Sequence, residues 1–248
     1  FHAAWQAFRS GSVERHGFKH EWRGLLLTHV YHPKLDMQHE HHREYFLNLV
    51  KQVGVPIKNE QVLLVANAEE VEAGIIQLQA HDVDPERAIC VAPGAQFGGA
   101  KRYPFESYAY ILKWLSDEGW QPVILGTQAE CDIGAACLQK ITGKKAWNAS
   151  GTTSLREALQ LVACSKLTLC NDSGLMHVSA GLGKPTVGIF GATEPSRTAP
   201  SGEHVRLLYQ PAVCSPCLQR ECHVVGQPCM VNILPEMVLE ACLEQLKA

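Results

Sequence analysis

The sequence has few charged residues, few aromatic residues and no long run of apolar ones. Charged residues make up 19% and aromatic residues 7% of its 248 residues, and the formal net charge is −3. No basic run dominates, so the composition does not indicate a general nucleic-acid-binding protein. The apolar stretches are far shorter than the roughly 20 residues that a membrane-spanning helix needs. With 46% hydrophobic residues, the chain has the composition of a globular protein with a sizeable core.

The first residues lack both a methionine and the features of a secretory leader. The chain starts with Phe1, and the next few residues have neither a basic start nor a long apolar stretch. We therefore expect the sequence to be processed or to be part of a longer chain.

From about residue 85 onward, the patterns of strands and helices alternate. Short apolar runs end at glycine or polar residues, and stretches with helical spacing follow them. Such alternation predicts βαβ units, hence an α/β fold with a parallel sheet covered by helices on both faces. The expected strands are 88–92, 122–125, 167–170 and 186–190, and the expected helices are 104–118, 130–141, 174–182 and two that begin near residues 154 and 235.

Residues 1–75 differ from the rest because they are richer in histidine and charge and contain no complete βαβ set. One amphipathic helix is expected at 40–53. We interpret 1–75 as the end of one domain and 76–248 as a second, Rossmann-like domain. His39, His41 and His42 could suggest a metal site, but alternation with acids favours a solvated helix face.

A glycine-rich loop with a lysine follows the first expected strand. It reads VAPGAQFGGAKRYP (residues 91–104) and contains Gly94, Gly98, Gly99 and Lys101. Glycines allow backbone amides to approach a ligand, and a helix N-terminus attracts anions. The loop therefore suits a diphosphate, although a mobile surface loop with a solvated lysine would look the same.

Two further turns follow strands. In LGTQAECD (125–132), Glu130 could bind ribose hydroxyls, or it could be an acid that favours the start of a helix. In NDSG (171–174), Asp172 or Ser173 could cap the next helix, and the turn could equally hold a phosphate or a sugar. His177 lies one turn further along.

Four cysteines cluster near the C-terminus. The spacing in CSPCLQRECHVVGQPC (214–229) is a C-x2-C pair followed by two more thiols, which could hold zinc. It does not match a standard zinc finger or ribbon. Reduced thiols or disulfides are the alternatives. The four residues are Cys214, Cys217, Cys222 and Cys229.

Several of these stretches together resemble the lipopolysaccharide heptosyltransferases of glycosyltransferase family 9, most closely their type II members. The similar stretches are PGAQFGGAKRYP, NDSGLMHVSAGLGKPTVGIFGATEP, LPEMVLEACLEQL and, upstream, HGFKHEWRGLLLTH. The resemblance implies a GT-B fold with two Rossmann-like domains. The C-terminal domain would be complete, the N-terminal one only partly present, and the last helix would pack back toward the first domain.

The resemblance also implies roles for individual residues. Lys101 would contact the diphosphate and, with Asp172, would be catalytic. Glu130 would bind the ribose, with Asp132 as a rival. Met176 would line the nucleotide pocket, and His177 would support the turn or reach the phosphates. The implied donor-binding residues are Gly94, Ala95, Lys101, Glu130, Asp172, Ser173, Gly174, Met176, His177 and Thr193.

The implied reaction is the inverting, metal-independent transfer of L-glycero-D-manno-heptose from ADP-heptose to the inner core of lipopolysaccharide. No cofactor and no nucleic acid would take part. The enzyme would be cytoplasmic and would contact the cytoplasmic face of the inner membrane peripherally. The family's general base, an aspartate of the N-terminal domain, has no matching motif in residues 1–75, where Asp36 follows a Pro-Lys-Leu turn.

Two other functions fit parts of the pattern. A sugar-nucleotide epimerase would share the two-domain architecture and would bind a UDP-sugar. A non-catalytic binding domain organised by zinc at the four clustered cysteines is the other alternative.

Overall fold

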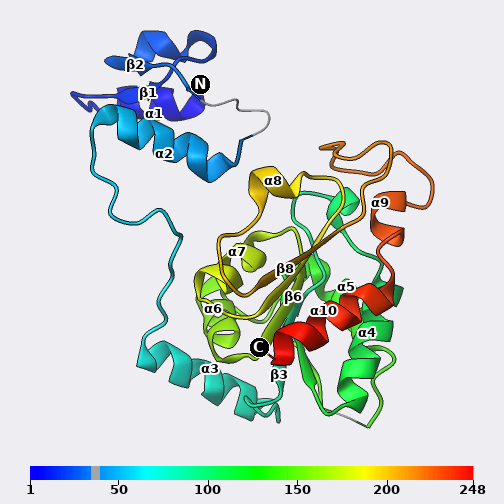
Figure 1. Cartoon of the computed structure of the whole chain (residues 1–248). Helices are drawn as coiled ribbons and strands as arrows, with labels where there is room; N and C mark the ends of the chain where they lie inside the picture. The colour runs from blue at the N-terminus through cyan, green and yellow to red at the C-terminus, as the bar shows by residue number, and fades with distance from the viewer. Residues whose placement is uncertain (35–39, 144, 248) are drawn as a thin grey trace. The chain divides into compact units, whose positions relative to one another are not determined.

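The computed structural model describes residues 1–34, 40–143 and 145–247, and its contacts divide the chain into two units (Figure 1). The first unit contains Phe1–Gln61 with Ser196–Ala199. The second contains Val62–Pro195 with Pro200–Ala248. No helix among the described residues is long and apolar enough to cross a bilayer.

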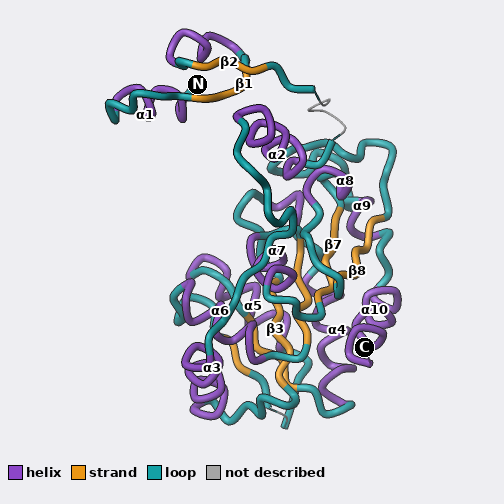
Figure 2. Tube along the Cα trace, turned by 60° about the vertical axis from the view of Figure 1, so that its left-hand side comes forward, coloured by secondary structure: helices purple, strands orange, loops and turns teal. Residues whose placement is uncertain are grey.

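The second unit contains a six-stranded parallel sheet with the strand order β5-β4-β3-β6-β7-β8. Its strands are drawn in orange in Figure 2, where β3, β7 and β8 are labelled. Numbered by their place in this unit, the strands run 3-2-1-4-5-6, which is the order of a Rossmann sheet. The predicted α/β class with a parallel sheet is therefore confirmed. The strands are β3 (Ala88–Ala92), β4 (Gln121–Ile124), β5 (Trp147–Asn148), β6 (Leu167–Asn171), β7 (Thr186–Phe190) and β8 (Val205–Tyr209).

Both faces of the sheet are buried, as expected for a parallel sheet. All residues of β3, β6 and β7 are buried. Along β3, Ile89 and Val91 join one hydrophobic core, whereas Ala88 and Cys90 join the other. This alternation follows from the two-residue period of a strand and explains why these strands consist almost entirely of apolar residues.

Helices cover each face of the sheet (Figure 1). One core contains side chains of α4 (Phe105–Asp117), α5 (Cys131–Leu138) and α10 (Pro235–Lys247). The other contains side chains of α3 (Ala68–Ala80), α6 (Leu155–Cys164) and α7 (Gly174–Gly181). The last helix, α10, packs against α4 and against strands of its own unit.

The predicted elements agree with the structure at most positions. The strands 88–92 and 186–190 are confirmed to the residue, and the helix near 154 begins with a capping box formed by Ser154 and Glu157. The helix predicted at 130–141 is shorter, Cys131–Leu138, and follows a 3-10 turn at Gln128–Glu130. Among the strands of the sheet and the longer helices that cover it, the prediction missed α3, β5 and β8.

The predicted domain boundary at 75/76 is wrong because it falls inside α3. This helix begins at Asn67, which forms a capping box with Glu70, and it packs on α6 within the second unit. A side chain at Gly74 would place its Cβ 2.4 Å from the carbonyl oxygen of Gln160. The two helices are thus in backbone contact, and the first unit ends earlier, at Gln61.

The first unit contains α1 (His2–Arg9), β1 (His16–Phe18), a 3-10 helix (Glu21–Leu26), β2 (His29–Tyr31) and α2 (His42–Val53). The helix predicted at 40–53 is confirmed, and it ends at Gly54 in the left-handed conformation. Two short helices remain. They are α8 (Pro195–Thr198), most of which belongs to the first unit, and α9 (Pro228–Val231), which belongs to the second. Asp36 and His39, considered in the sequence, lie outside the described residues.

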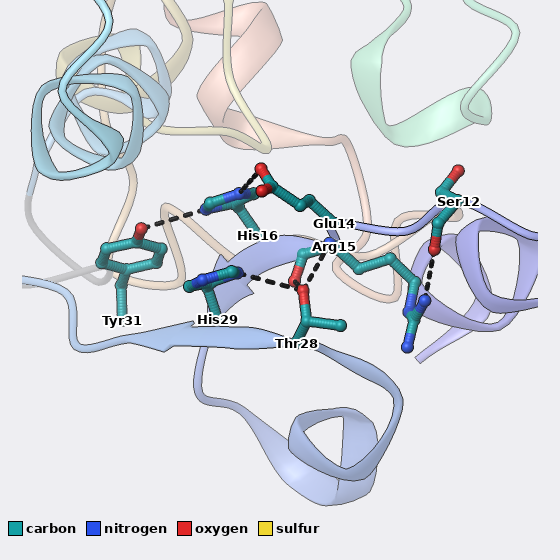
Figure 3. Close-up of polar contacts among 7 residues, drawn as sticks. All are labelled: Ser12, Glu14, Arg15, His16, Thr28, His29 and Tyr31. Carbon is teal, nitrogen blue, oxygen red and sulfur yellow. Dashed lines mark hydrogen bonds and ion pairs between the residues drawn. The ribbon is translucent and has the colours of Figure 1, made fainter.

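A polar cluster joins the two parallel strands of the first unit (Figure 3). The rings of His16 and His29 stack with their centroids 4.3 Å apart and their planes 3° from parallel. Nδ1 of His16 lies 3.0 Å from the hydroxyl of Tyr31, and Nε2 lies 3.3 Å from Glu14. The contacts of His16 with His29 and Tyr31 cross from β1 to β2 and help to hold the two strands together.

The packing of α3 on α6 gives a first prediction. The variant Gly74→Ala should lower the free energy of unfolding by about 1–3 kcal/mol, because the new methyl group cannot fit against the backbone of α6. Gln79→Ala, at an exposed position of the same helix, should change it by less than about 0.5 kcal/mol. Urea denaturation followed by circular dichroism measures both. Equal stability of the two variants would show that α3 does not pack on α6.

Candidate functional site

A pocket of about 550 Å³ lies at the carboxyl ends of the strands. The neighbouring strands β3 and β6 lead to helices on opposite faces of the sheet, α4 and α7. This is the switch point at which doubly wound sheets bind their ligands. The lining residues come from the end of β3, from the turns after β3, β4, β5 and β6, and from the first turns of α6 and α7: Ala92, Gly94, Ala95, Gln96, Leu125, Gly126, Thr127, Gln128, Glu130, Gly151, Thr153, Ser154, Leu155, Ala158, Ser173, Gly174, Leu175 and Val178.

The side chain of Asn171 joins the two strand ends at this switch point. Its amide nitrogen donates to the carbonyl oxygens of Pro93 at 2.6 Å and Gly94 at 3.2 Å. Its Oδ1 accepts from the amide of Tyr103 at 3.2 Å and from the hydroxyl of Tyr108 at 3.0 Å. Burial raises the pKa of the Tyr108 phenol well above its usual value, so this donor keeps its proton.

Next to the pocket, three side chains from successive strand ends meet. The ammonium of Lys101 donates to Oδ2 of Asp172 at 2.5 Å, and the hydroxyl of Thr193 donates to the same oxygen at 2.6 Å. Asp172 and Thr193 are each only 7% exposed. The expectation that Lys101 and Asp172 lie together is therefore confirmed. A buried carboxylate that accepts two hydrogen bonds has a fixed orientation, and here it fixes the cation too.

The N-terminus of α7 faces the pocket without a side-chain cap. Ser173 occupies the cap position but makes no capping hydrogen bond, and its buried Oγ has no partner among the described residues. The carboxylate of Asp172, the other predicted cap, accepts hydrogen bonds from Lys101 and Thr193 instead. The first amides of this helix can thus donate hydrogen bonds to a ligand. There is open space beside them, because a Cβ added at Gly174 would meet no atom within 4 Å.

Glu130 presents one carboxylate oxygen to its own turn and the other to the pocket. Oε2 accepts from the amide of Thr127 at 2.8 Å and from its hydroxyl at 2.9 Å. A Cβ at Gly94 would lie 1.8 Å from Oε1, so only glycine leaves room for the carboxylate there. Glu130 thus caps a turn, as one of the two interpretations expects, and it also lines the pocket.

The other predicted site residues lie in different surroundings. Ala95 lines the pocket. Met176 does not: it is fully buried against Ala92, Cys170 and Phe190, because its position on α7 faces the sheet. The expectation that it lines the nucleotide pocket is corrected accordingly. His177, one residue later, is exposed on the other side of the helix.

The cysteines do not form a metal site in the described residues. No group of three or more His, Cys, Asp or Glu side chains there is arranged to hold a metal ion. All ten cysteines lie within the described ranges and are free thiols. Burial raises the pKa of the Cys90 thiol to about 12 and also raises the pKa of Cys229, which favours the protonated, unreactive form.

The four hydrogen bonds of the Asn171 side chain, called the Asn171 clamp below, give a second prediction. Asn171→Ala should lower the free energy of unfolding by about 3 kcal/mol or more, because it leaves buried donors and carbonyls unpaired. Tyr108→Phe removes one of the four hydrogen bonds and should cost about 1 kcal/mol. Thermal and urea unfolding of both variants test this. If Asn171→Ala costs no more than Tyr108→Phe, the amide does not link the two strand ends.

Comparison with known proteins connects this site to a family. A family model described as glycosyltransferase family 9 (heptosyltransferase) matches residues 1–227. Lipopolysaccharide heptosyltransferase 2 of Escherichia coli is 41% identical over 119 residues, 47% of this chain and 34% of the relative. Lipooligosaccharide heptosyltransferase 2 of Haemophilus influenzae is 28% identical over 215 residues, 83% of this chain and 62% of the relative. The matched part thus spans about a third to three fifths of these two relatives.

Solved structures agree with this grouping. The ADP-heptose heptosyltransferase II of E. coli superposes with a TM-score of 0.79 at 27% identity, covering 99% of this chain and 73% of that one. A family 9 glycosyltransferase of Veillonella parvula gives a TM-score of 0.80 at 19% identity, covering 98% and 70%, and supports the fold alone. The predicted GT-B fold class is confirmed by these neighbours. Since the family model spans most of the chain, the chain belongs to glycosyltransferase family 9, the heptosyltransferases.

Proposed function

We propose that the protein transfers L-glycero-D-manno-heptose from ADP-heptose to the inner core of lipopolysaccharide. One observation carries the proposal: a lysine, a buried carboxylate and an uncapped helix N-terminus meet beside a pocket at the sheet's switch point. Such an arrangement suits a diphosphate next to a nucleoside. The names of the similar proteins, heptosyltransferases acting on lipopolysaccharide or lipooligosaccharide, support the choice of sugar and acceptor.

The nucleoside would occupy the pocket. Its walls combine apolar residues such as Leu125 and Ala158 with the polar groups of Glu130 and Ser154. Oε1 of Glu130 has no hydrogen bond to the rest of the described chain, so it can accept from the two ribose hydroxyls. Gly94 would let the ribose approach this carboxylate closely.

The diphosphate would lie between Lys101 and the N-terminus of α7, with the sugar near Asp172, Ser173 and Gly174. As the bond to the sugar breaks, negative charge grows on the departing ADP. Groups already aimed at that charge stabilise the transition state more than the ground state. Lys101 and the first amides of α7 would act in this way without a metal. Asp172 and Thr193 would keep the lysine in place.

The acceptor hydroxyl must lose a proton to a base and attack from the opposite side of the sugar, which inverts the anomeric centre. The resemblance predicts an aspartate for this step. Asp36, the one aspartate in residues 1–75, lies outside the described residues. The acceptor is a lipid-linked saccharide, so we further propose that the enzyme works at the cytoplasmic face of the inner membrane through peripheral contact.

Nucleotide choice tests the proposal directly. ADP and ADP-sugars should raise the melting temperature of the chain, because a ligand that binds only the folded state stabilises it. UDP and UDP-sugars at the same concentration should have little effect. A larger shift with UDP-sugars would favour the epimerase alternative, and no shift with any nucleotide would contradict a nucleotide-sugar site.

The role of Lys101 gives a fourth prediction. Lys101→Ala should weaken ADP-heptose binding about tenfold or more, the usual size of a lost hydrogen bond to a charged group. Isothermal titration calorimetry measures this. Lys113→Ala, which removes an exposed lysine paired with Asp117 on α4, is the matched control and should bind like the parent chain.

A second variant separates binding from folding. Lys101→Ala leaves the buried carboxylate of Asp172 without its cation, which can destabilise the protein. Lys101→Ala/Asp172→Asn removes both charges and should unfold closer to the parent chain while still binding weakly. Unchanged affinity in both variants would reject the assignment of Lys101.

A further inference from the structure

The segment 212–229, which carries the four clustered cysteines and is called the cysteine loop below, lies against the turn 98–101. The amide of Ala100 donates to the carbonyl oxygen of Arg220 at 2.9 Å. In return, the side-chain amide of Gln227 donates to the carbonyl oxygen of Ala100 at 2.9 Å. The cysteine loop therefore satisfies both backbone groups of the residue that directly precedes the catalytic lysine candidate.

The two glycines of this turn are explained by the cysteine loop rather than by a ligand. A Cβ at Gly98 would lie 2.2 Å from the carbonyl oxygen of Arg220, and one at Gly99 would lie 2.4 Å from Oε2 of Glu221. The amide of Gly99 also donates to Oε1 of Glu221 at 3.1 Å. At Gly98 the neighbouring atom is backbone, so only a residue without a side chain allows the two segments to approach so closely; at Gly99 it is the end of the Glu221 side chain.

Side chains connect the two segments as well. The guanidinium of Arg220 lies over the ring of Phe97, 5.1 Å from its centroid, and the ammonium of Lys101 lies 4.9 Å from the same centroid. Nη1 of Arg220 also donates to the carbonyl oxygen of Phe97 at 3.2 Å. The ring thus contacts two cations, and its position limits where the lysine can go.

We infer that Arg220 and Glu221 of the cysteine loop are positioning residues that hold Lys101 ready for the diphosphate. The inference rests on the proposed function, because it assigns Lys101 to that group. A lysine has a flexible four-carbon stem, and fixing it before the ligand arrives reduces the entropy lost on binding. Glu221 fixes the backbone of the turn, and Arg220 fixes the ring on which the lysine lies.

The positioning of Lys101 by Arg220 and Glu221 should affect only the diphosphate end of the ligand. The adenosine end would lie at Glu130, which is held by Thr127 in its own turn. The diphosphate end would lie at Lys101, whose turn is held by the cysteine loop. A weakened loop should therefore lower the affinity for ADP and leave the affinity for adenosine unchanged.

The test compares ADP with adenosine on the full chain by calorimetry. Glu221→Ala should weaken ADP binding about fivefold, the usual effect of one lost hydrogen bond, and should leave adenosine binding unchanged. Glu221→Gln keeps an oxygen that can accept from Gly99 and should restore ADP binding. Glu118→Ala, which removes an exposed acid at the end of α4, should affect neither ligand.

The possible outcomes are distinct. The inference is overturned if Glu221→Ala binds ADP as the parent chain does, if it loses ADP and adenosine equally, or if Glu221→Gln fails to restore ADP binding. The proposed function fails separately if the parent chain binds ADP no better than adenosine and Lys101→Ala changes neither affinity. A loss of ADP affinity in both Lys101→Ala and Glu221→Ala, with adenosine unaffected, supports both.

Discussion

The candidate site depends on one buried amide, that of Asn171. Strands β3 and β6 are neighbours in the sheet, but the helices that follow them cover opposite faces, so their ends separate at this point. A separation of this kind creates the pocket and also leaves backbone carbonyls that need partners. Asn171 satisfies the carbonyls of Pro93 and Gly94 from the end of β6. The same side chain therefore sets how far the two turns open.

Around this clamp, polar groups divide into those paired within the protein and those turned to the pocket. In Glu130, one oxygen caps a turn and the other lines the pocket. At the start of α7, Asp172 is engaged by Lys101 and Thr193, so the helix amides are left for a ligand. Groups of this second kind cost stability when nothing pairs with them, which is the usual reason to look for a ligand beside them.

Much of the fold follows from local signals in the sequence. The strand 88–92 ends at Pro93-Gly94, and the helix after Ser154 begins with a capping box, so both could be predicted within a residue. The short strand β5 and the edge strand β8 lack such a signal, because β8 buries only Leu208 fully. The helix α3 was missed although Asn67 and Glu70 have the spacing of a capping box. Its assignment to the second unit depends on contact with α6, far along the chain.

In the candidate site, too, local sequence signals predict some features and miss others. Position in a motif predicted which turns meet, and Lys101 and Asp172 do lie together. It could not predict which side of α7 faces the sheet, so Met176 was assigned to the pocket although it is buried in the core. A glycine has no side chain to reveal its neighbour: Gly94 adjoins Glu130, whereas Gly98 adjoins Arg220, more than a hundred residues away. Two glycines of one loop thus serve different needs, and only the folded chain distinguishes Gly94, which leaves room for a carboxylate at the pocket, from Gly98, which leaves room for another loop.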